Sequence, residues 1–366
     1  MKLLKITALN IVAVAVILAS CATSQNNSLA AGSPETPVTF SSLEKYLTYQ
    51  AFGASIIGEL DSMSASKDLR NNQHVAIKQL RNNIRKISSK KTFFLSLNNA
   101  DSYSLQIMEL IYQLDLPIRV QWTEQAQNFL FSDLMTEPLT GFCQSLHQDA
   151  IDAIASNVIA SDQKTTIIFM KNYSIAVKKL QEFLPNSTAI QFDSSGPQEF
   201  ASMLLGINES QKRFMKIKNL NPNQELKFSP RARDDIQKIV LILEPSQYKS
   251  LLPALRYHGG SNFEYINFIS SLESLEDVYQ LLDFENTMLP LSLNIIAKIK
   301  SQEIESLASL TRDSVLNDWL LIELMNQSGI RSADISGMTG SLEFRKGSCA
   351  KRTISLESIN SQLVTS

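Results

Sequence analysis

Two arginines and two aspartates stand together in the run Ser229-Pro230-Arg231-Ala232-Arg233-Asp234-Asp235. A guanidinium group binds a carboxylate through two parallel hydrogen bonds, so Arg231 and Arg233 are candidates for contacting a carboxylate of a partner molecule. The alternative is a solvated loop whose local ion pairs contribute little to stability. The residues alone favour the solvated loop.

A second group of polar residues directly follows three apolar runs that we expect to be strands. In open α/β sheets, ligands bind outside the carboxyl ends of the strands, so these residues are candidates for lining a ligand cleft. The segment 98–101 would serve equally well as the N-cap of a following helix, and both interpretations stay open. The candidates are Asn98, Asn99, Lys171, Asn172 and Glu244.

No catalytic signature accompanies these residues. The chain has no G-x-S-x-G elbow, no Walker A loop and no G-x-G-x-x-G turn. Its three histidines, His74, His147 and His258, lie far apart in the sequence, whereas zinc sites need clustered His and Cys ligands. The sequence therefore predicts no metal, no cofactor and no enzymatic activity.

The one cysteine with a predicted chemical modification is Cys21. Lys2 and Lys5 precede an apolar run over 6–18, and Leu18-Ala19-Ser20-Cys21 resembles a lipobox, in which small residues precede a cysteine that is acylated. The run is too short for an ordinary transmembrane helix. We expect residues 1–20 to be a signal peptide and acyl chains on Cys21 to anchor the protein. The residue after the cysteine is Ala22, which resembles the default in Gram-negative lipoproteins that are sent to the outer membrane. We therefore expect the protein at the periplasmic face of that membrane.

Composition limits the remaining possibilities. Residues 21–39 are rich in small and polar residues and predict a flexible tether. Basic and acidic residues nearly balance, at 34 and 36, with no block of like charge, so nothing indicates nucleic acid as a partner. Cys143 and Cys349 could form a disulfide in an oxidising compartment or be buried singly, because pairing cannot be read from a sequence.

Alternating strands and helices predict an α/β fold with doubly wound parallel sheets, because parallel strands need crossover helices. A helix is expected from Ser66, within an N-terminal helical segment over 40–90. The last third is expected to be more helical, over 281–324, and to end in a hairpin of 341–344 and 352–356 with its turn at Lys346-Gly347. The expected strands are 93–97, 118–122, 165–170, 189–192, 239–243 and 265–269, and two short helices are expected at 200–205 and 214–220.

Several motifs, taken in order, resemble one family. They are Gln198 to Gly206, which ends in Leu-Leu-Gly, then Leu226 to Ile236, then Glu244 to Tyr248 after a strand, and Gly337 to Leu342 near the C-terminus. This order is similar to that of the penicillin-binding-protein activator lipoproteins of the LppC type. The resemblance extends over 141–355 and more weakly over 92–141.

The resemblance implies a type I periplasmic-binding-protein-like fold with two α/β lobes. Lobe 1 would comprise 91–143 and 270–335, and lobe 2 would comprise 144–269 and 336–366. It also implies that the protein binds and stimulates a class A penicillin-binding protein, which polymerises and crosslinks peptidoglycan. Larger members carry an N-terminal helical-repeat domain, for which 40–90 is too short. The family's opening strand and the turn after it have no counterpart here, so lobe 1 is expected to be reduced.

Two functional hypotheses follow. The first is an outer-membrane lipoprotein that regulates peptidoglycan synthesis, with the lobes as a docking surface. The second is a solute-binding lipoprotein that holds a small ligand in the cleft between the lobes. A cell-wall hydrolase is disfavoured, because no nucleophile and base can be paired.

Overall fold

The computed structural model describes residues 71–90, 92–98, 103–113, 117–123, 138–161, 164–193, 196–220, 222, 224–259, 263–272, 275, 277–300 and 307–361. The predicted signal peptide, tether and acylation site at Cys21 lie outside these residues. So does Asn99.

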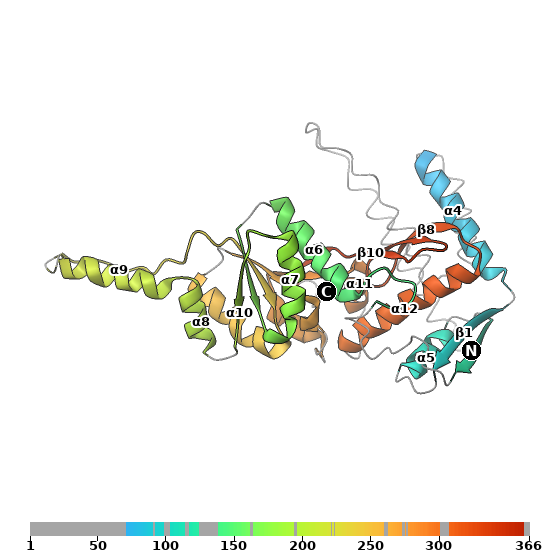
Figure 1. The fold of residues 1–366 in the computed structure, drawn as a ribbon, viewed down its shortest axis with the longest axis horizontal. Coiled ribbons are helices and arrows are strands. Elements are labelled where there is room, and N and C mark those ends of the chain that lie inside the picture. The colour runs from blue at the N-terminus through green and yellow to red at the C-terminus, as the bar shows by residue number, and fades with distance from the viewer. Residues whose placement is uncertain are drawn as a thin grey trace.

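A six-stranded sheet forms the centre of the larger part of the molecule (Figure 1). Its strand order is β11-β7-β6-β5-β3-β4, and every pair is parallel except the one that edge strand β11 makes with β7. All five residues of β5 are buried, as expected for a strand covered on both faces. The strands are β3 (Thr165–Phe169), β4 (Thr188–Gln191), β5 (Lys238–Ile242), β6 (Glu264–Asn267), β7 (Thr287–Pro290) and β11 (Leu356–Ile359).

Helices cover both faces of this sheet. From β3 the chain passes through α7 to β4 at one edge, and from β5 it passes through α10 to β6 in the opposite direction. Because such crossovers are right-handed, α7 and α10 lie on opposite faces. α6 packs beside α7, and α8 beside α10. The doubly wound α/β class is therefore confirmed. These helices are α6 (Leu146–Ser161), α7 (Ser174–Phe183), α8 (Pro197–Leu204) and α10 (Pro245–Gly259).

The expected first lobe contains a parallel sheet of only two strands in the described part of the chain. These are β1 (Phe93–Asn98) and β2 (Ile118–Thr123), and α12 (Leu307–Gln327) packs against β1 and against α5 (Ser104–Gln113). The Gln327 side chain accepts a hydrogen bond from the Phe94 N–H at 2.9 Å and donates one to its carbonyl at 2.6 Å. The Gln327 amide thus satisfies the edge of β1 as a further strand would.

The C-terminal segment forms the predicted hairpin. β8 (Ser332–Ser336), β9 (Ser341–Arg345) and β10 (Lys351–Thr353) make an antiparallel sheet in the order β10-β9-β8. Helix α4 (Asn71–Ser88) lies beside β8, and the Gln79 side chain reaches the carbonyl of Ser332 at 3.5 Å.

The segment 281–324, which was expected to be more helical, contains a strand near its start. The 3₁₀ helix η6 (Val278–Phe284) leads into strand β7, and α11 (Leu293–Lys300) begins only afterwards. β7 has four residues, ends in a proline and is too short to show a period, so pairing with β6 and β11 decides its structure. The predicted lobe division assigns β7 to lobe 1, but the strand belongs to the six-stranded sheet. Two further 3₁₀ helices are η4 (Lys171–Tyr173) and η5 (Ile269–Leu272).

One buried cation joins the separate parts of the fold. Nη1 of Arg352, on β10, lies 3.1 Å from Oδ2 of Asp149, on α6, and both side chains are almost fully buried. Asp318, on α12, also acts on Arg352 electrostatically, and it accepts hydrogen bonds from the backbone N–H groups of Met338 and Thr339. Burial raises the pKa of Asp149 to about 7 although Arg352 opposes the shift, and burial also raises the pKa of Asp318.

Cys143 and Cys349 form a disulfide beside this cluster, which settles the alternative that the sequence left open. The Cα atoms are 4.9 Å apart. Next to the disulfide, the N–H of Cys143 donates to the carbonyl of Ala350 at 3.0 Å, and the Phe142 ring lies 4.3 Å from the Arg352 guanidinium. The bond therefore fixes the segment before α6 to the segment before β10.

Removing the disulfide should destabilise the protein strongly. Its two cysteines are 206 positions apart, and a crosslink over a long loop restricts the unfolded chain most. We expect the variant with Cys143→Ser and Cys349→Ser to lose about 2–5 kcal/mol of unfolding free energy in denaturant titrations. Reduced wild-type protein should match this variant, and an unchanged midpoint in both samples would contradict the assignment.

The buried aspartate should make stability depend on pH. Because the pKa of Asp149 rises from 3.8 to about 7 on folding, the native state binds a proton between these values that the unfolded chain releases. The contribution of this bound proton to stability is complete below pH 3.8, the pKa in the unfolded chain. It is lost as the pH rises through about 7, the pKa in the native state. Replacing Asp149→Asn should flatten this decline by about 1 kcal/mol per pH unit.

Denaturant unfolding at about pH 5 and about pH 8 measures the effect on the two sides of the shifted pKa. Asp234→Asn, at an exposed aspartate, provides the control. Equal pH dependence in the Asp149 variant and the wild type would show that Asp149 keeps an ordinary pKa.

Candidate functional site

Helix α9 (Ile207–Leu220) extends away from the body of the molecule and forms one end of its long axis (Figure 1). The chain returns to the sheet through residues 224–235, which have no regular secondary structure apart from a turn. We call α9 and this returning segment the projecting arm. The sequence predicted only a short helix at 214–220, and the structure begins it seven residues earlier.

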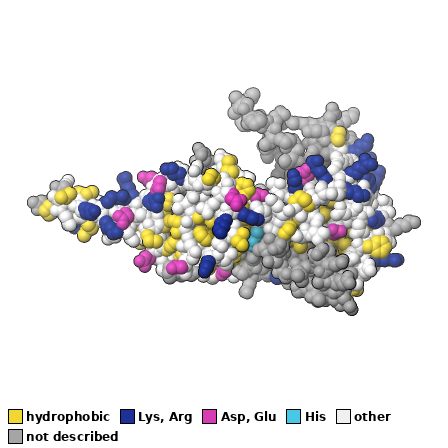
Figure 2. All heavy atoms as spheres, in the orientation of Figure 1, with side chains coloured by type: hydrophobic (Ala, Val, Ile, Leu, Met, Phe, Trp, Pro, Cys, Tyr) yellow, Lys and Arg dark blue, Asp and Glu magenta, His cyan; other side chains and the backbone are white. Residues whose placement is uncertain are grey.

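The surface of the projecting arm is both apolar and basic (Figure 2). Ile207 is the only residue of α9 that is buried. The ring centroids of Phe214 and Phe228 are 4.8 Å apart, and this contact joins the helix to the returning segment. Residues 207–235 contain seven Lys and Arg and four Asp and Glu. The exposed apolar side chains are Met215, Ile217, Leu220 and Phe228.

A close backbone approach fixes the base of the arm. The N–H of Arg233 donates to the carbonyl of Leu205 at 2.9 Å, and Gly206 has a φ of +70°. A Cβ atom on Gly206 would lie 2.9 Å from Cγ of Arg233. Glycine is therefore required here for its conformation and for its lack of a side chain. The Leu-Leu-Gly motif and the arginine run, which are far apart in sequence, meet at this point.

The two candidate arginines differ in their surroundings. Arg233 donates from Nε and Nη2 to the carboxylate of Asp235 at 2.8 and 2.5 Å, and this pairing lowers the pKa of Asp235 to about 2. Arg233 thus fits the solvated loop with a local ion pair. The side chain of Arg231 is exposed and has no ion pair among the described residues, so Arg231 remains a candidate partner contact.

The residues at the carboxyl ends of the strands are only partly brought together. Nδ2 of Asn172 donates to Oε1 of Glu244 at 3.0 Å, and Lys171 is exposed beside them. Strands β3 and β5 are neighbours whose crossovers leave in opposite directions, which makes this the switch point where α/β sheets bind ligands. Asn98 ends β1 in the separate two-stranded sheet.

Two further observations concern the described residues as a set. No group of three His, Cys, Asp or Glu side chains in this part of the chain could hold a metal ion. Within the same residues, every helix is too short or too polar to cross a bilayer.

Comparisons with known proteins do not identify a function for the sites described above. No protein-family model and no curated protein matches the sequence. An extracellular ligand-binding receptor from Verminephrobacter eiseniae aligns with 10% identity over 90% of this chain and 96% of its own, with a TM-score of 0.34. A leucine-binding protein from Thermotoga maritima aligns with 10% identity over 85% of this chain and 92% of its own, with a TM-score of 0.36. TM-scores of this size support no functional inference.

Replacing Gly206→Ala should loosen the base of the arm. An alanine at positive φ costs about 1–2 kcal/mol, and the contact with Arg233 adds to this cost. Limited proteolysis should then cleave residues 207–235 faster than in the wild type.

Gly329→Ala is the matched control, because Gly329 has a φ of +69° with no atom within 4 Å of a Cβ. Its stability should fall by the backbone cost alone, while cleavage in the arm stays at the wild-type rate. Equal cleavage of the arm in both variants would mean that contact at Gly206 does not hold it.

Proposed function

We propose that this protein is a lipoprotein, acylated at Cys21 and held at the periplasmic face of the outer membrane, that binds and activates a class A penicillin-binding protein. On this proposal it regulates peptidoglycan synthesis and is not itself an enzyme. The projecting arm is the element that docks on the synthase.

The observation that carries the proposal is the surface of the arm. Its apolar side chains have no covering element among the described residues, and solvent-exposed apolar patches of this kind are typical of interaction sites. Lys212 forms an ion pair with Glu209, but Arg231 has no carboxylate partner in the described structure. The complementary surface on the synthase is therefore an apolar groove with acidic residues at its rim.

A second line of support comes from the motifs that resemble the activator family. Leu205 and Arg233 belong to two of them, and their backbones are hydrogen-bonded where the arm joins the sheet. The resemblance thus falls on the residues that position the arm.

Binding between the full-length protein in detergent and the organism's class A penicillin-binding proteins tests the proposal. The variant with Ile217→Ser and Leu220→Ser removes two exposed apolar side chains from α9 and should weaken binding about tenfold or more. Stimulation of glycan polymerisation and crosslinking, measured in the same samples, should fall with it.

Ile175→Ser is the control, since Ile175 is an exposed isoleucine on α7, outside the arm. It should bind and stimulate like the wild type. Full stimulation by the double variant would exclude the arm as the docking element. No binding by the wild type at concentrations well above micromolar would exclude the proposed role itself.

The alternative function is that of a solute-binding lipoprotein, and the switch point favours it. Asn172 and Glu244 supply an amide and a carboxylate there, and Lys171 adds a cation. A ligand with an amino group and a carboxylate would match these charges. Thermal shifts with a panel of amino acids, abolished by Glu244→Gln, would support this function over the first.

A further inference from the structure

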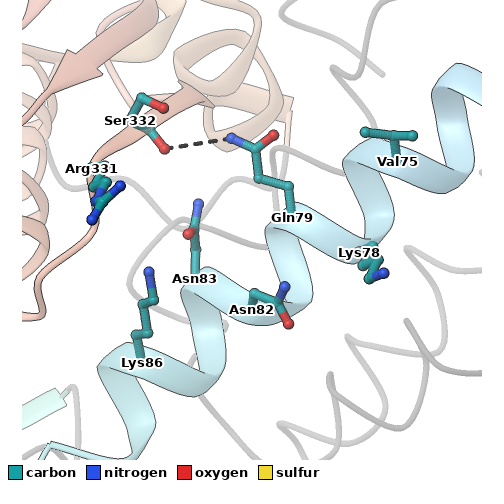
Figure 3. Close-up of a pocket in the computed structure, with 8 residues that line it drawn as sticks. All are labelled: Val75, Lys78, Gln79, Asn82, Asn83, Lys86, Arg331 and Ser332. Atoms are coloured by element: carbon teal, nitrogen blue, oxygen red, sulfur yellow. Dashed lines mark hydrogen bonds between the residues drawn. The ribbon is translucent and has the colours of Figure 1, made fainter.

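A cavity of about 310 Å³ lies between α4 and the start of β8, remote from the projecting arm (Figures 1 and 3). One side is a single face of α4, since its contributing residues recur at the i, i+4 and i+8 spacing of a helix. The opposite side comes from the segment that enters β8. The lining residues are Val75, Lys78, Gln79, Asn82, Asn83, Lys86, Arg331 and Ser332.

The cavity has an excess of positive charge. Lys78, Lys86 and Arg331 line it, none of the eight lining residues is acidic, and none of these three cations has an ion pair among the described residues. In Figure 3 the side chains of Lys86 and Arg331 both extend into the space between helix and strand. Three uncompensated cations repel one another, and an anion between them would relieve that repulsion.

The lining also supplies neutral hydrogen-bond donors. Asn83 is more than nine-tenths buried, yet its side chain faces the cavity and has no hydrogen-bond partner in the described structure. Asn82 adds a second amide. The Asn83 amide can therefore donate a hydrogen bond to a ligand in the cavity.

We propose that this cavity binds a phosphate group. Two ammonium groups, one guanidinium and two amides offer more donors than the two oxygens of a single carboxylate can accept. A phosphate has three oxygens to accept them and carries a charge of about −1.5 to −2 near neutral pH. The group could be the phosphate monoester headgroup of an anionic lipid, which a chain acylated at Cys21 would meet, or a soluble phosphate monoester.

Two binding measurements on the full-length protein distinguish these sources. One is calorimetric titration with pyrophosphate at physiological salt. The other is sedimentation of the variant Cys21→Ser, which has no acyl chains to bind every bilayer, with vesicles that contain phosphatidic acid or with vesicles of phosphatidylcholine alone. Binding to pyrophosphate that competes with the vesicles assigns a general phosphate site. Binding only to vesicles that contain phosphatidic acid assigns the lipid headgroup.

The variant with Lys86→Gln and Arg331→Gln should weaken whichever binding occurs about tenfold or more. The matched control is Arg213→Gln with Lys218→Gln, which removes the same charge from the exposed surface of α9. It should change the dissociation constant by less than about twofold, because remote surface charges are screened at physiological salt.

Asn83→Leu separates the site from general electrostatics, because it removes an amide from the cavity lining without changing the charge. Its folding is checked by thermal unfolding, and it too should weaken binding. Equal weakening by the cavity and control variants, tighter binding of citrate than of pyrophosphate, or no binding of either probe would overturn the proposal. None of these outcomes depends on whether a synthase binds the arm.

Discussion

The buried guanidinium of Arg352 is the interaction on which the arrangement of this molecule depends. Arg352 lies on a strand of the C-terminal sheet and forms an ion pair with Asp149 on α6, a helix that packs on the six-stranded sheet. It also interacts electrostatically with Asp318 on α12. A buried ion pair adds little net stability, but losing one partner leaves a charge without compensation. The cluster therefore specifies how the parts pack more than it strengthens them. The disulfide beside it fixes the same junction covalently.

This junction lies between regions whose surfaces differ in chemistry. At one end of the long axis lies a surface with apolar side chains that nothing described covers, and towards the other end lies a cavity with cations that nothing described neutralises. The carboxyl edge of the doubly wound sheet lies between them, where Asn172 and Glu244 bond to each other.

The sequence alone could predict the central sheet because its strands are buried on both faces. Runs such as 239–243 are continuously apolar, and this signal does not depend on distant residues. β7 could not be predicted in the same way, since its four residues acquire strand structure only by pairing with β6 and β11. Propensity over so short a segment is overridden by tertiary contacts.

The same distinction, between local sequence signals and contacts with distant residues, applies to the candidate sites. The residues at the ends of β3 and β5 could be predicted because each group directly follows a continuously apolar run. The pairing of Arg233 with Asp235 was foreseeable from their spacing. The exposure of α9 could not be predicted. Its apolar residues Phe214, Ile217 and Leu220 are spaced like those of a helix face that packs on a core. In the cavity, Arg331 lies more than 200 positions from Lys78 and Lys86, and Arg352 lies 203 positions from Asp149, so no local pattern connects them.

The hydrogen bond between Leu205 and Arg233 has an evolutionary consequence. It closes a loop whose two ends lie side by side, so the chain between them is an insertion that the sheet does not need for its own packing. The entropy of closing a loop grows only slowly with its length, and residues can be added or deleted there at little cost. Proteins built on this sheet could thus change the surface that the arm exposes by changing a single contiguous segment, while the strands and the buried charges that hold them stay the same.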